Sequence, residues 1–409
     1  MAGKRAWHVP QWSCLLAMPE NSPNQPASPA TAIFSSLDTL AFANGKPELA
    51  ATLKQEFTDF RVDEQLSFAF TEKGEHAYLW IEKIDRSTID VAKKLSEVTG
   101  VHSSDIGYSG MKDRRAETRQ WFSIKLPAGR ESELTACESD SLRIVETHRN
   151  SRKLKIGSHR ANHFRILLRD CDGSRDEFEE RLTQIEAGGV PNYFGSQRFG
   201  KGLSNLTQVQ AWMSATLDVD SGSTIDAAAA AIPKQRFKRS MLFSAARSYL
   251  FNQLLSRRLE LGNWNGYIAG DVLNLAGTDR SFALATGVEW DAILQQRVED
   301  FDIHITGPLP GETDPKDKYV SCGEAADIEE AVCKEFTTLL AGLRHFGLKT
   351  ARRPLRFRPI DLKWEWQQSE HAGGASDLLL DFSLGKGAYA TSLLRELCVT
   401  REPGRKIAS

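Results

Sequence analysis

The sequence has no long apolar run, no metal-ligand pattern and almost no net charge. No apolar stretch approaches the roughly 20 residues that a membrane-spanning helix needs, which excludes a transmembrane protein. The six cysteines include no Cys-x-x-Cys pair, and the histidines form no cluster at metal-ligand spacing. The motifs His-Glu-x-x-His, Gly-x-Ser-x-Gly and Gly-x-Gly-x-x-Gly are also missing. A zinc enzyme, a serine hydrolase and a dinucleotide-binding enzyme are therefore not indicated.

Scattered cysteines are typical of reduced thiols in a cytosolic protein, and most of them are expected to be buried. The N-terminus has no apolar signal segment, because Lys4 and Arg5 are followed by Trp7, His8 and Pro10. A cytoplasmic location is the resulting expectation.

The net charge of −2 is the difference between 52 basic and 54 acidic residues, and it disfavours a polyanionic partner. The charges are segregated along the chain, however. Residues 148–169 contain seven Lys or Arg and no acid, and residues 349–363 contain six against one acid. Residues 289–330 contain twelve acids and three bases. Local charge density sets the potential at a surface, so the near-zero sum does not exclude a nucleic-acid partner.

The 409 residues are enough for two or three domains with their own cores. Residues 1–45, rich in Pro, Ser and Asn from Glu20 to Thr31, are expected to form a flexible extension. Beyond them, the pattern predicts strands at 77–83 and 120–126, a helix from Ser87 or Thr88 to Gly100, and a turn at 110–113. A long helix is predicted at 244–261. These hairpins and helices indicate an α+β fold.

The segment 107–122 has the highest density of candidate catalytic and charged residues in the chain. Asp113 lies in a glycine-preceded turn among Lys112, Arg114 and Arg115, a setting that favours an ionised carboxylate. Alternatively, Asp113 caps the turn that begins at Arg114.

The segment 191–200 has the sequence Pro-Asn-Tyr-Phe-Gly-Ser-Gln-Arg-Phe-Gly. It alternates aromatic side chains with glycines and a basic side chain, as a nucleic-acid-binding loop does. Its aromatic residues Tyr193, Phe194 and Phe199 are equally consistent with a tight turn in the core, and Arg198 is the better surface candidate.

Four blocks closely resemble the TruD family of tRNA pseudouridine synthases. They are Gly110-x-Lys-Asp-x-x-Ala-x-Thr-x-Gln-Trp121, Val190-Pro-Asn-Tyr-Phe-Gly-x-Gln-Arg-Phe-Gly200, Ser244-Ala-Ala-Arg-Ser-x-Leu-Phe-Asn252 and Ala388-Tyr-Ala-Thr-Ser-x-Leu-Arg-Glu-Leu397. They occur in the family's order, and the resemblance covers about 57–397.

The resemblance implies a catalytic domain of the pseudouridine synthase type, with a mixed, largely antiparallel sheet. This domain would comprise 46–188 and 356–409, interrupted by an α/β TRUD insertion domain at 189–355. The implied reaction is isomerisation of uridine 13, in the D arm of tRNA, to pseudouridine, without cofactor or metal. A catalytically idle tRNA-binding or folding protein of the same architecture is the alternative. The resemblance implies no membrane association and names no protein partner.

The family's catalytic aspartate matches Asp113, which would act as the nucleophile or as the base that starts elimination. Phe60 and Asn162 match substrate-contacting residues, Phe164 matches the aromatic that stacks on the base, and Tyr389 falls where some members have phenylalanine. Each aromatic can instead be a core residue, and Asn162 a turn residue.

Basic residues near these positions are candidates for contacts with RNA phosphates. They are Lys112, Arg152, Lys153, Lys155 and Arg198. The two basic windows are expected to border a tRNA-binding cleft.

Overall fold

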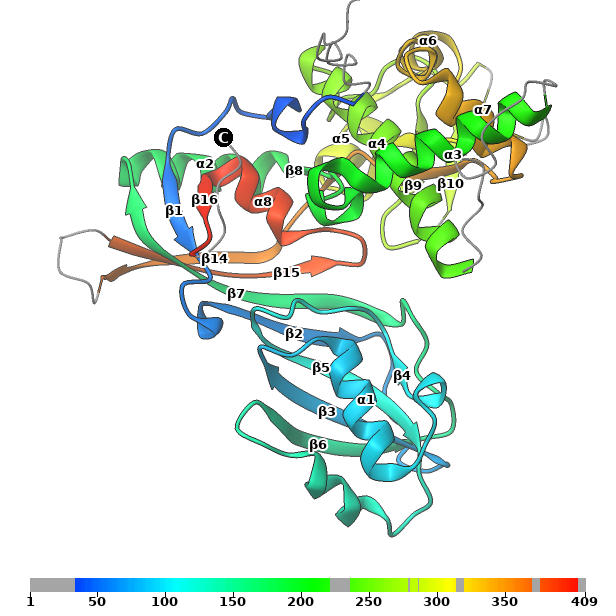
Figure 1. Ribbon diagram of the computed structural model, residues 1–409. Helices are drawn as coiled ribbons and strands as arrows, with labels where there is room; N and C mark the ends of the chain where they lie inside the picture. The colour runs from blue at the N-terminus through cyan, green and yellow to red at the C-terminus, as the bar shows by residue number, and fades with distance from the viewer. Residues whose placement is uncertain are drawn as a thin grey trace, which may run out of the picture. The chain divides into compact units, whose positions relative to one another are not determined.

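The computed structural model describes residues 34–220, 236–278, 280–285, 287–313, 320–369 and 376–403. Residues from Leu37 onward belong to one compact unit. Its organisation is α+β with a mixed sheet, which confirms the fold class predicted from the sequence (Figure 1).

Among the described residues, the larger sheet has ten strands, seven of them in the order β14-β15-β7-β2-β5-β3-β6. Strand β1 pairs with β7 and β16, and β4 pairs with β5. The pairs β1–β16 and β2–β5 are parallel, and the others are antiparallel. The strands are β1 (Ala50–Leu53), β2 (Phe60–Leu66), β3 (His76–Ile84), β4 (Gly107–Tyr108), β5 (Glu117–Lys125), β6 (Leu142–Asn150), β7 (His159–Asp172), β14 (Ile360–Gln368), β15 (Ser376–Gly385) and β16 (Val399–Arg401).

Helix α1 (Thr88–Thr99) covers β3 and β5, and its bounds agree with the helix predicted from Ser87 or Thr88 to Gly100. Ser87 and Asp90 form a capping box at its start, and Gly100 ends it with a φ of 73°. Its Val91 and Leu95 are buried against Leu79 of β3. The period of the helix and the alternation of the strand therefore meet in one core.

A second core lies where β7 and β15 pack against α2 (Arg175–Gly188) and α8 (Ala390–Leu397). Strand β7 pairs with β1 and β2 from the start of the chain and with β15 from its end. This pairing brings both ends of the chain to one part of the sheet.

The middle of the chain forms a smaller antiparallel sheet in the order β10-β9-β11-β12, together with five helices among the described residues. A two-stranded pairing of β8 (Val190–Pro191) with β13 (Arg356–Phe357) lies where this segment leaves and rejoins the rest. The remaining elements are α3 (Ser204–Asp220), α4 (Arg236–Glu260), β9 (Val272–Leu275), β10 (Ser281–Ala283), α5 (Ala292–Glu299), β11 (Ile303–Leu309), α6 (Gly323–Lys334), α7 (Thr337–His345) and β12 (Ala351–Pro354).

Residues 37–45, placed in the flexible extension by their sequence, are instead packed. Leu40 is buried, the amide of Ala43 donates a 2.9 Å hydrogen bond to Glu396, and Arg395 lies 3.5 Å from the ring centre of Phe42. The predicted boundary at 45 is therefore wrong, because this segment finds partners on α8. The preceding residues 1–33 lie outside the described part of the chain.

Cysteine burial follows the prediction only in part. Cys137 and Cys398 are buried, Cys171 and Cys333 are half-buried, and Cys322 is exposed; all five are free thiols. Burial raises the pKa of Cys171 to about 12.

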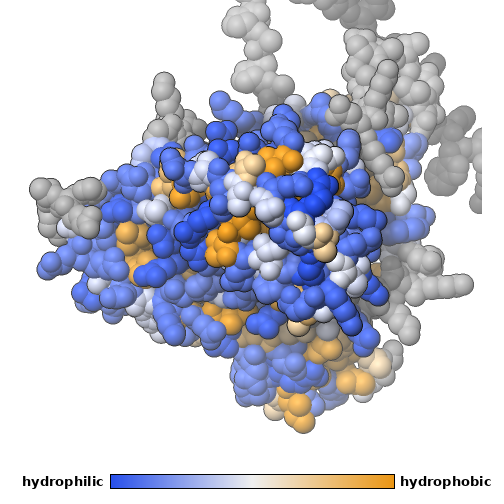
Figure 2. Space-filling view, turned by 90° about the horizontal axis from the view of Figure 1, so that it is seen from below, coloured by the Kyte–Doolittle hydropathy of each residue, from blue (hydrophilic) through white to orange (hydrophobic). Residues whose placement is uncertain are grey.

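The surface seen in Figure 2 is mostly hydrophilic, with hydrophobic residues in small separate groups. Within the described ranges, no helix combines the length and the apolar character that crossing a bilayer requires.

Candidate active site

A chain of hydrogen bonds fixes the turn that carries Asp113. Gln120 is buried in β5 and donates to the carbonyl of Gly110 at 3.1 Å. The hydroxyl of Thr88, at the start of α1, donates to Gln120 at 2.7 Å and accepts from the amide of Lys112 at 3.0 Å. The turn is thus tied to both α1 and β5, which places Asp113 with little freedom.

The carboxylate of Asp113 forms an ion pair with Lys54. The distance from Nζ to Oδ2 is 2.7 Å, and the side chains are 9% exposed for Lys54 and 33% for Asp113. Asp113 is therefore accessible while its charge is compensated. Residues 114–116 form bends that lead into β5, and the Asp113 carboxylate accepts its hydrogen bond from Lys54 and not from a backbone amide of this segment, so the alternative that Asp113 caps the turn at Arg114 is wrong.

A second lysine holds the backbone of the same turn. The fully buried ammonium of Lys83 donates to the carbonyl oxygens of Asp113 at 3.0 Å and Arg86 at 2.6 Å. Burial lowers the pKa of Lys83 to about 8, while the nearby charge of Asp113 opposes that shift.

Aromatic rings lie beside the ion pair. The Lys54 ammonium is 4.1 Å from the ring centre of Phe60, and Phe60 contacts Phe164 edge to face at 6.1 Å. Phe164 stacks on Phe382 at 5.4 Å. Phe60 and Phe164 are 3% and 8% exposed, so both rings are part of the hydrophobic core. A role in a substrate pocket would be in addition to that packing.

Asn162 lies in a polar group next to the turn. Lys112 donates to the amide oxygen of Asn162 and forms a 3.0 Å ion pair with buried Glu64. Glu64 also accepts from the amide of Trp121 at 3.2 Å. Lys112 is therefore committed within the protein, which argues against the predicted contact between this residue and RNA phosphate.

His159 lies close to this group, and its Nδ1 is buried without a hydrogen-bond partner in the described structure. Its pKa is lowered, first by burial and then by the charge of Lys112. The ring Cε1 would lie 3.8 Å from a Cβ placed on Gly110, so His159 borders the turn.

Tyr389 belongs to a different contact group. Its hydroxyl accepts a 2.9 Å hydrogen bond from Arg198, which also donates to Ser244 at 2.9 Å. The ring of Tyr389 lies 6.2 Å from that of Phe194. No contact links Tyr389 directly to Asp113 in the described structure, although Tyr389 follows β15, whose Leu384 pairs with Asn162.

The loop 191–200 contributes mainly to the core. Tyr193, Phe194 and Phe199 are 3%, 8% and 0% exposed, which confirms the alternative that makes them core residues. Arg198 is half-buried, and its contacts with Tyr389 and Ser244 make it less available to RNA than predicted.

The first basic window is partly used within the protein. Arg149 pairs with Glu131, and Arg169 with Asp59 at 2.7 Å. Arg152 and Lys155 are exposed, and the half-buried Lys153 donates to a backbone carbonyl at 2.6 Å. The predicted RNA contacts at Arg152 and Lys155 therefore remain sterically open.

Three basic residues of the second window, Lys349, Arg358 and Lys363, are exposed, and the other three are engaged within the fold, which corrects the prediction of a cleft border for that half. Arg352 pairs with Glu329 at 2.8 Å, and Arg356 is 5% exposed. Arg353 donates to Asn192, and burial lowers its pKa to about 10. Buried guanidinium groups need acceptors nearby, and the fold supplies them.

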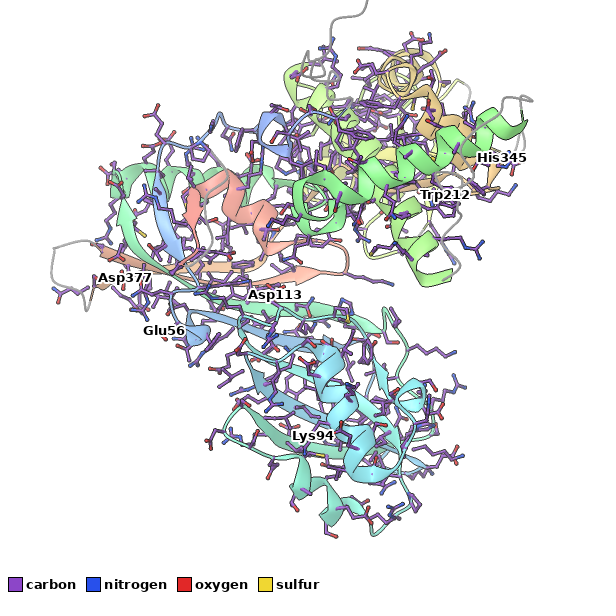
Figure 3. All side chains as sticks on the ribbon, in the orientation of Figure 1. Glu56, Lys94, Asp113, Trp212, His345 and Asp377 are labelled. Atoms are coloured by element: carbon purple, nitrogen blue, oxygen red, sulfur yellow. The ribbon has the colours of Figure 1, made fainter. Side chains whose placement is uncertain are left out.

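Lys54 and Glu64 are the site residues that sequence reasoning missed. Lys54 lies 59 positions before its partner Asp113, in a stretch with no motif. Figure 3 shows Asp113 away from the ends of the sheet, among side chains from strands distant in sequence. No group of three or more His, Cys, Asp or Glu side chains able to hold a metal occurs among the described residues.

Comparisons with known proteins agree on one family. A family model described as tRNA pseudouridine synthase D (TruD) matches residues 36–215 and 211–397. A tRNA pseudouridine synthase D from Hydrogenovibrio crunogenus is 37% identical over 362 residues, 88% of this chain and 96% of that protein. Another, from Stutzerimonas stutzeri, is 40% identical over 356 residues, 87% of this chain and 94% of that protein.

A solved structure shows the same fold. The crystal structure of a Methanosarcina mazei protein described as a tRNA pseudouridine synthase D superposes with a TM-score of 0.68 at 24% identity. The match covers 90% of this chain and 98% of that chain.

Proposed function

The chain belongs to the TruD family of tRNA pseudouridine synthases, and from this premise we propose that Asp113 is the nucleophile with which it isomerises uridine 13, in the D arm of tRNA, to pseudouridine. The observation that carries the assignment of Asp113 is its ion pair with Lys54, at 2.7 Å, on a partly exposed turn beside Phe60. A carboxylate that is held by an ion pair and partly exposed is placed to act as a nucleophile on a bound nucleotide.

The isomerisation needs no co-reactant, because product and substrate have the same atoms and electrons. The N1–C1′ bond breaks, the base turns while it stays bound, and a C5–C1′ bond forms. The bond that the Asp113 carboxylate forms to the nucleotide breaks again before the product leaves, which regenerates the carboxylate. The proton on C5 leaves and N1 gains one. Phe60, Phe164 and Asn162 are the residues proposed to retain the detached base, with Tyr389 as a further contact. The target uridine must first leave its stack, at a cost of a few kcal/mol.

We also propose that residues 46–188 and 356–409, together with the segment 37–45 that packs on α8, form the catalytic domain and that 189–355 form an inserted domain. The strand pairs support this division, because the larger sheet draws its strands from both flanks and the smaller sheet from the middle. The β8–β13 pair lies at the junction. We place the reaction in the cytoplasm, where its tRNA substrate is available.

The substitution Asp113→Asn tests the nucleophile. We expect it to abolish tritium release from tRNA labelled at uridine C5, while the Kd for tRNA stays within about tenfold, since only one charge is lost. Asp105→Asn, at an exposed position in a short helical turn, is the matched control and should release tritium at the parent rate. Parent-rate release from Asp113→Asn would remove Asp113 from the mechanism.

Carbodiimide primer extension tests the position. tRNA incubated with the parent protein should gain one stop at uridine 13, and tRNA incubated with Asp113→Asn should not. A stop elsewhere would overturn the proposed position alone, while tRNA binding by a parent that forms no pseudouridine would favour the non-catalytic alternative.

A further inference from the structure

A cavity of about 730 Å³ lies among α3, α4 and the end of α7, and neither Asp113 nor Phe60, Asn162 or Phe164 is among its lining residues. Trp212, labelled on α3 in Figure 3, forms part of its wall together with Phe243 and Phe346. The three rings contact one another with centroid distances of 4.7 to 5.2 Å. Phe243 and Phe346 are half-buried, so part of each ring remains accessible.

The same wall is positively charged. Arg239, Arg247 and Arg353 line the cavity, and none of its described lining residues is acidic. Arg247 donates to the carbonyl oxygens of Leu309 at 2.8 Å and Lys349 at 3.0 Å, neither of which neutralises its charge. A cavity with several arginines and no carboxylate suits an anion.

Two enclosed donors in this wall have no acceptor in the described structure. They are the Nε of Arg247 and the indole nitrogen of Trp212, a side chain only 3% exposed. A buried donor without a partner costs about 1–3 kcal/mol, which a ligand oxygen placed nearby would recover. The cavity wall therefore combines aromatic rings, positive charge and hydrogen-bond donors that have no acceptor.

The cavity borders the Tyr389 group. Ser244, in the cavity wall, accepts from Arg198, which donates to the Tyr389 hydroxyl. Arg353 lies 4.0 Å from the ring centre of Phe194 and donates to Gly387, two residues before Tyr389, at 2.8 Å. An RNA strand that contacts Tyr389 would have the cavity within reach of nearby nucleotides.

We propose that this cavity binds one unpaired nucleotide of the tRNA substrate, distinct from the target uridine, with its base against Trp212, Phe243 and Phe346 and its phosphate toward Arg239 and Arg247. Stacking on aromatic rings combined with phosphate contacts from arginine is how proteins hold single-stranded nucleotides. The inference rests on the proposed function, because it takes tRNA as the ligand. It assigns the middle segment of the chain a direct part in substrate binding.

Filling the cavity tests the proposal without removing an internal bond. Ser240 lines the cavity and is exposed on α4, whereas its neighbour Met241 is exposed but does not line it. We expect Ser240→Trp to raise the Kd and the KM for tRNA about tenfold, the value of one stacked base, with kcat within about twofold. Met241→Trp should leave both within about twofold. Equal effects of the two substitutions would overturn the proposal.

Charge reversal gives an independent comparison on the same helix. Arg239 lines the cavity, and the adjacent Lys238 does not. Arg239→Glu should weaken tRNA binding about tenfold more than Lys238→Glu, because only Arg239 is placed to meet the phosphate. The same loss of affinity from both would show that general charge, and not this cavity, is being measured.

Photocrosslinking locates the nucleotide directly. tRNA containing 4-thiouridine, irradiated with the parent protein, should crosslink to a peptide containing Trp212, Phe243 or Phe346, and Ser240→Trp should suppress that crosslink. Crosslinks confined to other peptides would contradict the proposal. Binding and crosslinking are measured without turnover, so a parent that binds here but forms no pseudouridine would overturn the proposed function and leave this site standing.

Discussion

Lys54 determines how Asp113 is presented. Its backbone has a φ of 58°, a left-handed conformation that costs a non-glycine residue about 1–2 kcal/mol. That conformation accompanies an ammonium 2.7 Å from the carboxylate. We expect Lys54→Gly to keep the fold, because glycine adopts this conformation freely. It should lower kcat for pseudouridine formation about 100-fold, the cost of a misplaced reacting group.

Thermal unfolding separates the two effects of Lys54→Gly. A midpoint close to that of the parent, together with the lower kcat, would assign the loss of activity to the missing ammonium. An unchanged kcat would show that Asp113 needs no partner at Lys54.

The buried ammonium of Lys83 should make the free energy of unfolding depend on pH. Its pKa is lowered by burial from 10.5 to about 8, so the folded state releases this proton more readily than the unfolded state. Between about pH 8 and 10.5 the unfolded chain holds the extra proton, and the free energy of unfolding should rise with pH through this contribution. Below pH 8 the contribution is constant.

The difference between the parent and Lys83→Met isolates this contribution from the other titrating groups. Urea unfolding at pH 7, 8, 9 and 10 should give a difference that is flat up to about pH 8 and then shifts in favour of the parent. A difference that does not change with pH would contradict the proposed ionisation of Lys83.

The turn that carries Asp113 could be predicted from sequence, whereas the ion-pair partner of Asp113 could not. The turn at 110–113 carries its own signals, a glycine followed by charged residues, and it matches a family motif. Lys54 follows β1 and Asp113 precedes β5, and the two meet because β1 and β2 both pair with β7 and β2 pairs with β5. Long-range pairing of this kind leaves no mark in the local sequence around Lys54.

Elements with strong local signals were predicted well. Helix α1 was found from its cap and its glycine stop, and β3 from its run of β-forming residues. Helix α4 extends from Arg236, whereas the prediction begins at Ser244, because three basic residues at 236–239 interrupt the apolar pattern before it. The parallel pairing of β2 with β5 depends on the arrangement of the whole sheet, which the segment patterns do not contain.

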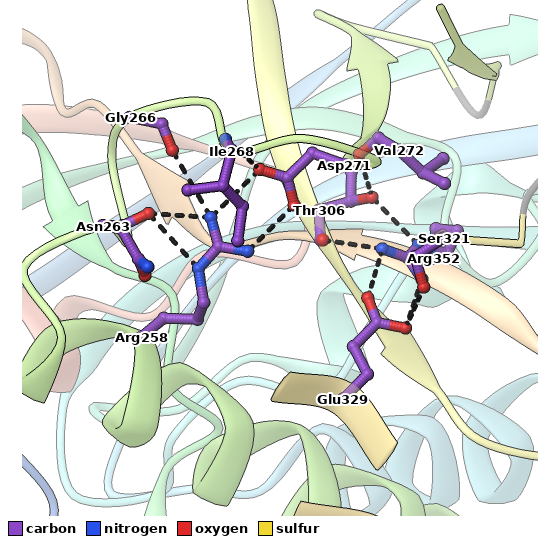
Figure 4. A network of polar contacts seen from close by, with 10 residues as sticks. All are labelled: Arg258, Asn263, Gly266, Ile268, Asp271, Val272, Thr306, Ser321, Glu329 and Arg352. Atoms are coloured by element: carbon purple, nitrogen blue, oxygen red, sulfur yellow. Dashed lines mark hydrogen bonds and ion pairs between the residues drawn. The ribbon is translucent and has the colours of Figure 1, made fainter. Parts of the chain in front are cut away.

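A buried polar network joins α4 to the smaller sheet (Figure 4). Arg258 pairs with Asp271 at 2.8 Å, with side chains 3% and 0% exposed, and also donates to the carbonyl of Asn263 at 2.7 Å. Arg258→Met leaves the buried carboxylate of Asp271 without its ion-pair partner. We therefore expect this substitution to lower the free energy of unfolding by about 3–5 kcal/mol. Urea unfolding monitored by circular dichroism measures this decrease.

The adjacent Arg257 is the control for Arg258. Its side chain is 53% exposed and pairs with Glu260 at the surface. Arg257→Met should change the free energy of unfolding by less than about 1 kcal/mol. Similar decreases from the two substitutions would mean that the burial of Arg258 does not determine its contribution.

At the scale of the whole molecule, the small net charge does not show that some basic side chains lie inside the fold and others at the surface. Arg352, Arg353 and Arg356 are engaged within the fold, so a dense basic window in the sequence does not by itself mark a binding surface. Arg152 and Lys155 are exposed on the loop between β6 and β7. This loop is therefore the better candidate for contacts with tRNA phosphates.

Salt dependence tests that loop. Each lysine or arginine that meets a phosphate releases a counterion, so the slope of log Kd against log salt counts the neutralised phosphates. We expect the triple substitution Arg152→Glu, Lys153→Glu and Lys155→Glu to weaken tRNA binding and to reduce the magnitude of the slope by about one for each phosphate that is no longer neutralised. Filter binding at several salt concentrations measures both quantities.

The matched control reverses the charge of three exposed basic side chains outside the loop between β6 and β7. Arg175, Arg257 and Lys334 have side chains 62%, 53% and 70% exposed, and their reversal changes the net charge by the same amount. Because long-range charge alone is screened within about 10 Å at 0.1 M salt, this control should keep the parent slope. If the loop variant also keeps the parent slope, the loop between β6 and β7 lies outside the tRNA interface, and the exposed bases Arg160 and Arg165 on β7 become the next positions to reverse.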